Sequence, residues 1–328
     1  FAAMAASAQI VDLVPTETGA PLAVLLKAAS DELRLHILRV LAQDSFSVSE
    51  LCTIFDLRQS ALSHHLKILI DAGLLNRRKE GTAIFYRRAL AEGPLHELQE
   101  QILQHIDETP ITRSNSLGIE RVQQQREDNS IAFFNGNADR FREQQELIAP
   151  WVDYSEITLQ LLDRLEGGTF DSIIEVGVGE GWLLPDLAKR ARSVTALDLS
   201  QEMLDLAQEH ASHLRNVSFV QGSTDVLVQR NHQADAIVVN MVLHHTSEPD
   251  KVLAEAACLL KSGGHFIVSE LCAHDQAWAR EHCGDLWLGF TPEQLEIWAG
   301  HGGLSLNASV FLAQRNGFQI QVQHFQSC

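Results

Sequence analysis

The sequence has no long apolar segment and few cysteines, and these absences exclude two classes of protein. No run of about 18 apolar residues occurs, so no stretch predicts a membrane-spanning helix. The five cysteines, at positions 52, 258, 272, 283 and 328, form no Cys-x-x-Cys pair and are odd in number. We therefore expect a cytoplasmic protein in a reducing compartment rather than a disulfide-stabilised one. Cys258 has apolar neighbours in a predicted helix and is expected to be buried.

Positive charge is also scarce, because 25 Lys and Arg stand against 43 Asp and Glu, a net charge of −18. The basic residues are nevertheless concentrated. Between Arg58 and Arg88, seven residues are basic and only Asp71 and Glu80 are acidic, which gives a local charge of +5. Salt screens charges beyond about 10 Å, so a local basic face can act on phosphates despite a distant acidic region. The same stripe is also compatible with an ordinary solvated surface.

The length of 328 residues predicts about two domains. Residues 1–19 lack a charged start and are expected to be a disordered or tag-like end rather than a signal peptide. Residues 20–108 contain short helical patterns and one hairpin, and residues 109–130 form a polar linker that becomes a connecting helix. Residues 131–328 alternate strand-like and amphipathic stretches, which predicts an α/β domain with a mostly parallel sheet.

Helical patterns follow one another in the first domain. Residues 31–42 have a wide apolar face, with Ser30 as the expected cap. Ser47 and Glu50 have the spacing of a capping box that begins a second helix. A third helix covers residues 60–72 and ends at Gly73. The short turn between the second and third helices predicts a helix-turn-helix.

The outward face of the third helix carries polar side chains suited to base edges and phosphates in a major groove. The basic hairpin after it, which turns at Gly81, would contact the DNA backbone or the minor groove. His65 also has a second interpretation, as a residue that packs or caps beside Leu66. The predicted DNA contacts are Gln59, Ser60, Ser63, His64, His65, Lys67, Arg77, Arg78 and Arg87.

The stretch ELCTIFDLRQSALSHHLKILIDAGLLNRRKEGTAIFYRR, residues 50–88, resembles the ArsR/SmtB family of regulators. Helix, turn, recognition helix and basic hairpin occur in that family's order. The resemblance implies an α+β winged helix-turn-helix fold that binds double-stranded DNA. It also implies a homodimer, with helices near 20–29 and 94–107 packing across the two-fold axis, and a palindromic operator.

The metal-binding residues of that family are largely missing. The family's Cys-x-Cys segment reads Cys52-Thr53-Ile54 here, so one thiolate remains. A second family site pairs histidines with carboxylates on the last helix, but His96, His105, Asp107 and Glu108 have a different spacing. Because a metal site needs several converging donors, we expect no metal.

A glycine-rich turn marks the second domain. It follows the apolar strand run Ser172–Val176 and reads E-x-G-x-G-x-G from Glu175 to Gly181. Glycine allows a tight turn and a close approach of a ligand to the backbone. This pattern also occurs in dinucleotide-binding domains and in α/β domains that bind no ligand. Asp198 ends the next predicted strand, where a carboxylate accepts hydrogen bonds from ribose hydroxyls.

Three later segments, in order, resemble the class I S-adenosylmethionine (SAM) methyltransferases over about residues 131–328. They are Ser200–Leu204, the polar turn Gly222–Asp225, and an Asn-x-Val-Leu-His-His loop that begins at Asn240. The resemblance implies a Rossmann-like, seven-stranded, mostly parallel sheet, with reversed last strands from the tail. It also implies that SAM or S-adenosylhomocysteine (SAH) is bound. The pocket residues that it implies are Glu175, Gly177, Gly179, Gly181, Asp198, Leu199, Met203, Ser223, Thr224 and Asn240.

Two features leave the chemistry of the second domain open. Relatives often carry an acid at the position of Ser223, and Asp225 is the residue that could compensate. Methyl transfer requires alignment and sometimes deprotonation of the acceptor, so no catalytic residue is assigned. His244 and His245 lie where such a base would act. If they are solvated and apart, a binding role is favoured, whereas an open second cavity favours catalysis.

The whole architecture resembles ArsR–methyltransferase fusions, including methionine-cycle repressors that respond to SAH. That resemblance implies a sequence-specific repressor of methionine-cycle genes, associated with the nucleoid when bound to its operator. SAH or SAM would be the effector. The alternative is an active small-molecule methyltransferase with an autoregulatory DNA-binding domain.

Overall fold

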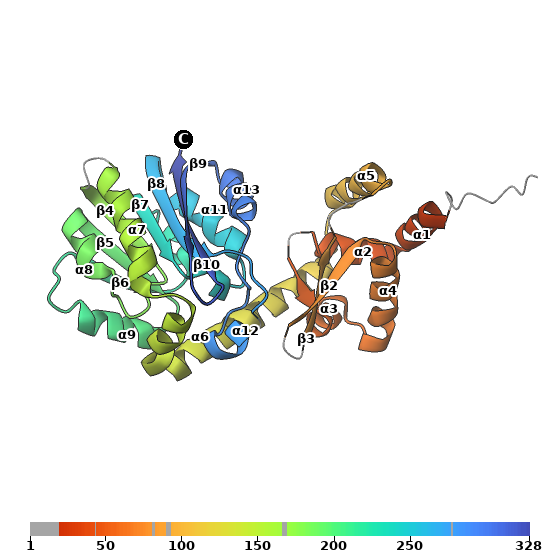
Figure 1. The fold of residues 1–328 in the computed structure, drawn as a ribbon, viewed down its shortest axis with the longest axis horizontal. Coiled ribbons are helices and arrows are strands. Elements are labelled where there is room, and N and C mark those ends of the chain that lie inside the picture. The colour runs from red at the N-terminus through yellow and green to blue at the C-terminus, as the bar shows by residue number, and fades with distance from the viewer. Residues whose placement is uncertain (1–19, 43, 81–82, 90–92, 166–168, 277) are drawn as a thin grey trace, which may run out of the picture. The chain divides into compact units, whose positions relative to one another are not determined.

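The computed structural model describes residues 20–42, 44–80, 83–89, 93–165, 169–276 and 278–328. The predicted N-terminal segment 1–19 and the hairpin turn at Gly81 lie outside these residues. The chain divides into two compact units, Phe1–Val122 and Gln123–Cys328 (Figure 1). Helix α6 (Arg113–Ile148) contributes residues to both units and contains most of the predicted connecting segment 109–130.

The first unit has the element order of a winged helix-turn-helix. A small antiparallel sheet in the order β1-β3-β2 lies beside the helices. The elements are α1 (Ala20–Ala29), α2 (Glu32–Val40), β1 (Phe46–Ser47), α3 (Val48–Phe55), α4 (Gln59–Asp71), β2 (Leu75–Glu80), β3 (Ala83–Arg88) and α5 (His96–Glu108).

Local hydrogen bonds begin and end these helices. The capping box of α3 is confirmed, because Ser47 Oγ accepts from the Glu50 N–H and Glu50 accepts from the Ser47 N–H. The prediction that Ser30 caps α2 is wrong. Asp31 occupies that position and accepts from the Arg34 N–H at 3.0 Å. Gly73 follows the end of α4 with φ +71°, a conformation that favours glycine.

The side chain of Arg88 joins the wing strand β3 to the neighbouring helices. Arg88 donates from Nε to the Leu38 carbonyl at 2.7 Å. Its two Nη atoms donate to both oxygens of Asp107 on α5, at 2.9 and 2.7 Å. Of the basic residues between 58 and 88, Arg88 therefore has a structural role that joins the wing to α2 and α5.

The second unit contains the expected seven-stranded sheet, in the order β6-β5-β4-β7-β8-β10-β9. Strands β4 to β8 are parallel, and β10 runs antiparallel between β8 and β9. Its further elements are α7 (Trp151–Arg164), β4 (Phe170–Val176), α8 (Leu184–Arg190), β5 (Ala191–Asp198), α9 (Gln201–His210), β6 (Val217–Gln221), α10 (Thr224–Gln229), β7 (Ala234–Asn240), η2 (Leu243–His245), α11 (Pro249–Leu259), β8 (Leu260–Leu271), α12 (Trp278–Cys283), α13 (Pro292–His301), β9 (Leu304–Ala313) and β10 (Gln319–Ser327).

Apolar side chains cover both faces of this sheet. Successive residues of β4 point to opposite faces, so Ile173 packs into one core cluster and Ile174 into the other. Helices α7, α8 and α9 contribute to the first cluster and α10, α11 and α13 to the second. The expectation for Cys258 is wrong, because it is exposed on α11. No helix among the described residues is long and apolar enough to cross a membrane.

The strand order indicates at which edge of the sheet a ligand would bind. The chain leaves β4 towards β5 on one side and later returns to β7 on the other. In open parallel sheets, ligands bind beyond the carboxyl ends of the strands at such a reversal. The turn after β4 and the loops after β5 and β7 meet there.

Candidate functional site: a pocket and an exposed polar helix

The turn after β4 is shaped by its glycines. Gly177 and Gly179 have φ of +68° and +52°. A Cβ on Gly177 would lie 2.4 Å from Val242 Cγ2, whereas no atom of the described residues lies within 4 Å of a Cβ built on Gly179. The N–H groups of Gly177 and Val178 donate to the Leu197 carbonyl at 2.8 and 3.0 Å. The turn is therefore fixed against β5 and leaves open space at Gly179.

Asp198 holds this turn from the end of β5. Its Oδ2 accepts from the Gly179 N–H and its Oδ1 from the Ser200 N–H, both at 2.9 Å. Burial raises the pKa of Asp198, although the backbone hydrogen bonds oppose that effect. The carboxylate keeps free lone pairs at the mouth of the turn, where ligand hydroxyls can donate.

Glu175 is an acid in an apolar position. Its side chain is buried, and Oε2 has no hydrogen-bond partner among the described residues. Burial, together with the charge of Asp198, raises the pKa of Glu175 to about 8. A positively charged ligand group would provide the counter-charge that this carboxylate lacks.

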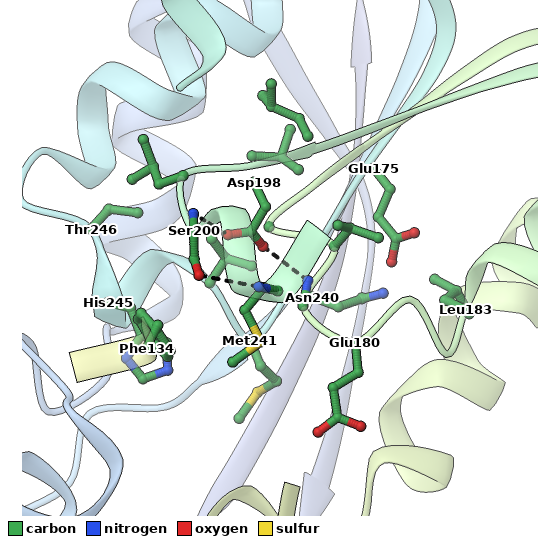
Figure 2. A pocket seen from close by; sticks show the side chains of 18 of the residues that line it. Phe134, Glu175, Glu180, Leu183, Asp198, Ser200, Asn240, Met241, His245 and Thr246 are labelled. Atoms are coloured by element: carbon green, nitrogen blue, oxygen red, sulfur yellow. Dashed lines mark hydrogen bonds between the residues drawn. The ribbon is translucent and has the colours of Figure 1, made fainter. Parts of the chain in front are cut away.

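One cavity joins these features, with about 1340 Å³ of empty space that includes a part open to solvent (Figure 2). Nine of the ten predicted pocket residues line it: Glu175, Gly177, Gly179, Asp198, Leu199, Met203, Ser223, Thr224 and Asn240. Gly181 does not line it. A Cβ there would lie 2.9 Å from the Cβ of Ala207, so Gly181 allows α9 to pack against the turn.

The polar turn before α10 forms internal hydrogen bonds. Ser223 donates to Asp225, and Thr224 donates to Glu255 on α11. The cavity lining includes Ser223 and Thr224 but not Asp225. Asp225 therefore accepts a hydrogen bond from a cavity residue but does not itself line the cavity.

Sequence reasoning missed the contribution of α6 and α7 to the cavity. Ile131 and Phe134 of α6, and Trp151 and Tyr154 of α7, line it. Asn135 of α6 accepts a 2.7 Å hydrogen bond from Ser200 Oγ, two residues after Asp198. The only signal in the sequence was the short apolar group at residues 131–134 within a polar helix.

The histidines after β7 are neither solvated nor apart. His244 is fully buried, and its Nδ1 lies 2.5 Å from Glu270 Oε1. His245 lines the cavity and stacks edge-on against Phe134, with 5.0 Å between the ring centroids. Burial, and then the charge of His244, lower the pKa of His245, so its imidazole is neutral at pH 7. The condition that favoured a pure binding role is therefore not met.

The first unit exposes most of the predicted DNA contacts. Gln59, Ser60, Ser63, His64 and Lys67 are exposed along α4. His65 differs, because its Nδ1 lies 3.4 Å from Oδ1 of Asp31 and its side chain is only 21% exposed. This contact favours the second interpretation of His65, in which the side chain packs or caps within the domain.

The wing carries exposed arginines on neighbouring strands. Arg77 of β2 and Arg87 of β3 are exposed, and the two strands pair directly. The side chain of Arg78 lies outside the described part of the chain. The described wing therefore presents positive charge that can contact phosphate.

Comparison with known proteins assigns both units. Residues 31–77 match the bacterial regulatory proteins of the arsR family, and residues 174–268 match a methyltransferase domain. The chain carries an ArsR-family helix-turn-helix domain and a class I methyltransferase domain. The ArsR match includes the whole of α4, and the methyltransferase match includes every predicted pocket residue.

The methyltransferase domain also resembles individual proteins. It is 31% identical over 151 residues to a ubiquinone biosynthesis O-methyltransferase of Serratia proteamaculans, covering 45% of this chain and 63% of that protein. A protein of the same name from Alkalilimnicola ehrlichii is 27% identical over 197 residues. That match covers 55% of this chain and 80% of the other protein. The chain thus spans less than two thirds of the Serratia protein.

Among solved structures, the N-methyltransferase NodS of Bradyrhizobium japonicum with bound SAH is 17% identical, with a TM-score of 0.46. The match covers 58% of this chain and 98% of NodS. The magnesium protoporphyrin IX methyltransferase of Synechocystis with bound SAM is 16% identical, with a TM-score of 0.46. The match covers 61% of this chain and 97% of the Synechocystis protein.

Proposed function

We propose that the chain is a sequence-specific transcriptional repressor whose methyltransferase domain binds SAH or SAM as an effector. It acts in the cytoplasm on a palindromic operator, where it is associated with the nucleoid, and it controls methionine-cycle genes. The ArsR domain supplies DNA recognition through α4 and the wing. The methyltransferase domain supplies the ligand pocket.

Helix α6 carries this proposal, because it takes part in both units. In the ArsR domain, its Gly118 packs so closely that a Cβ would lie 2.6 Å from the backbone of Ile54, on the helix before α4. In the methyltransferase domain, Ser130 Oγ donates to the His245 carbonyl at 3.2 Å, and Phe134 lines the cavity. A ligand that alters α6 at the cavity thereby changes the support of the helix-turn-helix.

The pocket residues are suited to bind SAM or SAH. Asp198 would accept from the ribose hydroxyls, Gly179 leaves room for the chain beside the turn, and the carboxylate of Glu175 would face an ammonium group. SAM supplies a sulfonium methyl group when bound, whereas SAH has lost it. Either ligand can shift DNA binding only through its different affinity for the operator-competent and released states.

The experiment is a titration of operator binding with each ligand. Operator sequences are selected from random duplex DNA with the purified chain, and binding is followed by fluorescence anisotropy at fixed salt. We expect saturating SAH to change operator affinity by about 5-fold or more. Asp198→Asn should abolish the response and keep ligand-free operator binding, while Asp205→Asn, exposed on α9, should respond normally. Operator affinity that is indifferent to both ligands would refute the proposal.

A second candidate is an active small-molecule methyltransferase that regulates its own operon. It is favoured by His245, a neutral imidazole at the cavity wall near the aromatic side chains Phe134, Trp151 and Tyr154. A neutral imidazole can accept the proton of a phenolic hydroxyl. SAH formation from SAM with catechol-type acceptors, lost in His245→Gln, would support it. Turnover at the rate of the buffer alone would exclude these acceptors.

A further inference from the structure

A second buried cluster lies behind the cavity wall. His244 and His245 of η2 meet Asp285, which follows α12 far along the chain. One ligand atom from each of the three side chains lies within 4.8 Å of the other two. Asp285 is 3% exposed, so the cluster is shielded from water.

The separations are too long for hydrogen bonds. His244 Nε2 lies 3.9 Å from Asp285 Oδ1, and His245 Nδ1 lies 3.7 Å from the same oxygen. Hydrogen bonds between these atom types require about 2.7–3.2 Å. Two ligands on one tetrahedral ion, with bonds of about 2.1 Å, are separated by about 3.4 Å. Binding an ion would therefore require the two nitrogen–oxygen distances to Asp285 to shorten by about 0.3–0.5 Å.

The polar atoms of Asp285 support this interpretation. Neither of its carboxylate oxygens, nor His244 Nε2, has a hydrogen-bond partner within the described ranges. A buried carboxylate that accepts no hydrogen bond is costly, and a bound cation would offset that cost. The guanidinium of Arg280 also acts on Asp285, and its charge lowers the affinity of the site for a cation.

Glu270 completes the arrangement from β8. Its Oε1 lies 2.5 Å from His244 Nδ1, and its Oε2 accepts from the His244 backbone N–H at 3.2 Å. A carboxylate on one ring nitrogen directs the other nitrogen outwards as a metal ligand. An ion would replace the proton on His244, and with two neutral imidazoles the charges of Glu270 and Asp285 would then balance those of a dication.

We propose that His244, His245 and Asp285 bind a divalent first-row transition ion, with Zn²⁺ as the reference ion and Glu270 as the positioning residue. The ArsR-type metal sites that the sequence lacks are unrelated to these residues. The ion would fix η2 to the segment after α12, where the N–H groups of Leu286 and Trp287 already donate to the His244 carbonyl at 2.8 and 3.0 Å. Because His245 lines the cavity, the site would set the position of one pocket wall.

The test uses the full chain, stripped with EDTA, dialysed and titrated with ZnCl₂ against a chromophoric chelator. We expect one Zn²⁺ per chain to be bound. Asp285→Asn and Glu270→Gln should each weaken binding by about 10- to 100-fold. Asp205→Asn, an exposed acid on α9, should leave it unchanged. Absence of binding, or equal affinity in Asp285→Asn, would overturn the proposal.

X-ray absorption of the zinc-loaded wild-type chain keeps the test valid if a variant fails to fold. We expect two histidine nitrogens and oxygen at about 2.0–2.2 Å. Sulfur at about 2.3 Å would place the ion on surface cysteines and overturn the assignment. SAH binding and the melting transition are measured on every sample. A chain that binds SAH but not Zn²⁺ refutes the metal site alone, and a chain that binds Zn²⁺ but not SAH refutes the effector alone.

Discussion

At the scale of single residues, Glu175 shows how a buried acid in the pocket lowers the stability of the folded state as the pH rises. Its buried carboxyl has a pKa of about 8, against 4.5 for an ordinary glutamate. The folded state therefore holds a proton that the unfolded state releases. The stabilising contribution is fully present below pH 4.5 and is lost as the pH rises through about 8.

We expect Glu175→Gln to raise the melting temperature of the ligand-free chain at pH 8.5 by at least about 3 °C. The amide has no charge to bury, so the gain should vanish near pH 5, where Glu175 is protonated in the folded state. Differential scanning calorimetry from pH 5 to 8.5 measures this difference. Glu202→Gln, exposed on α9, is the control and should show no gain at any pH. A gain that is the same at every pH would contradict this account of Glu175.

At the scale of elements, α6 contains two glycines in contrasting places. A Cβ on Gly118 would meet the backbone of Ile54 at 2.6 Å, whereas none of the described side chains lies within 4 Å of a Cβ on Gly136. Both residues are helical, so the two positions separate close packing from helix propensity.

Gly118→Ala is expected to weaken operator binding by about 10-fold, because α3 must move away from α6 by a few tenths of an ångström or more. SAH should still bind, since Gly118 does not line the ligand cavity. Gly136→Ala should leave both unchanged and stabilise α6 by about 0.5–1 kcal/mol. Anisotropy with operator DNA and calorimetry with SAH give the two readouts. Equal operator affinities for the two variants would rule out close packing at Gly118 as the cause.

Elements with local signals could be predicted from the sequence, and those formed by distant contacts could not. The capping box of α3 and the glycine turn after β4 depend on residues within a few positions of each other. The role of α6 in the cavity could not be predicted from the sequence. A single apolar turn in a polar helix does not indicate which part of the protein that turn contacts. The cluster of His244 with Asp285 was invisible because its members are distant in sequence. Ser30 and Asp31 are both good caps, so the pattern alone could not separate them.

At the scale of the whole molecule, α1 exposes large apolar side chains. Leu22, Val24 and Leu26 are 37%, 44% and 51% exposed. Large apolar side chains gathered on one short helix are typical of an interface. The resemblance to ArsR regulators implies that a second copy of the chain covers them.

The double substitution Leu22→Lys, Leu26→Lys should shift the chain towards monomers and reduce affinity for a palindromic operator by at least about 10-fold. Charged residues cannot be buried in the interface without partners. Analytical ultracentrifugation measures the association state, and anisotropy measures the operator affinity. Ile297→Lys, at an apolar residue on α13 that is 58% exposed, is the control. A double variant that remains dimeric would exclude α1 from the interface.

The position of β10 within the sheet has a consequence for biosynthesis. This strand, Gln319–Ser327, lies between β8 and β9, so the sheet stays incomplete until residue 327 has left the ribosome. The ArsR domain, near the beginning of the chain, is by then already free to fold. Any transcript whose translation stops before β10 would yield a polypeptide with the ArsR domain but an incomplete methyltransferase sheet. Under the proposed function, late nonsense mutations should therefore abolish the change in operator affinity with SAH or SAM while operator binding itself remains.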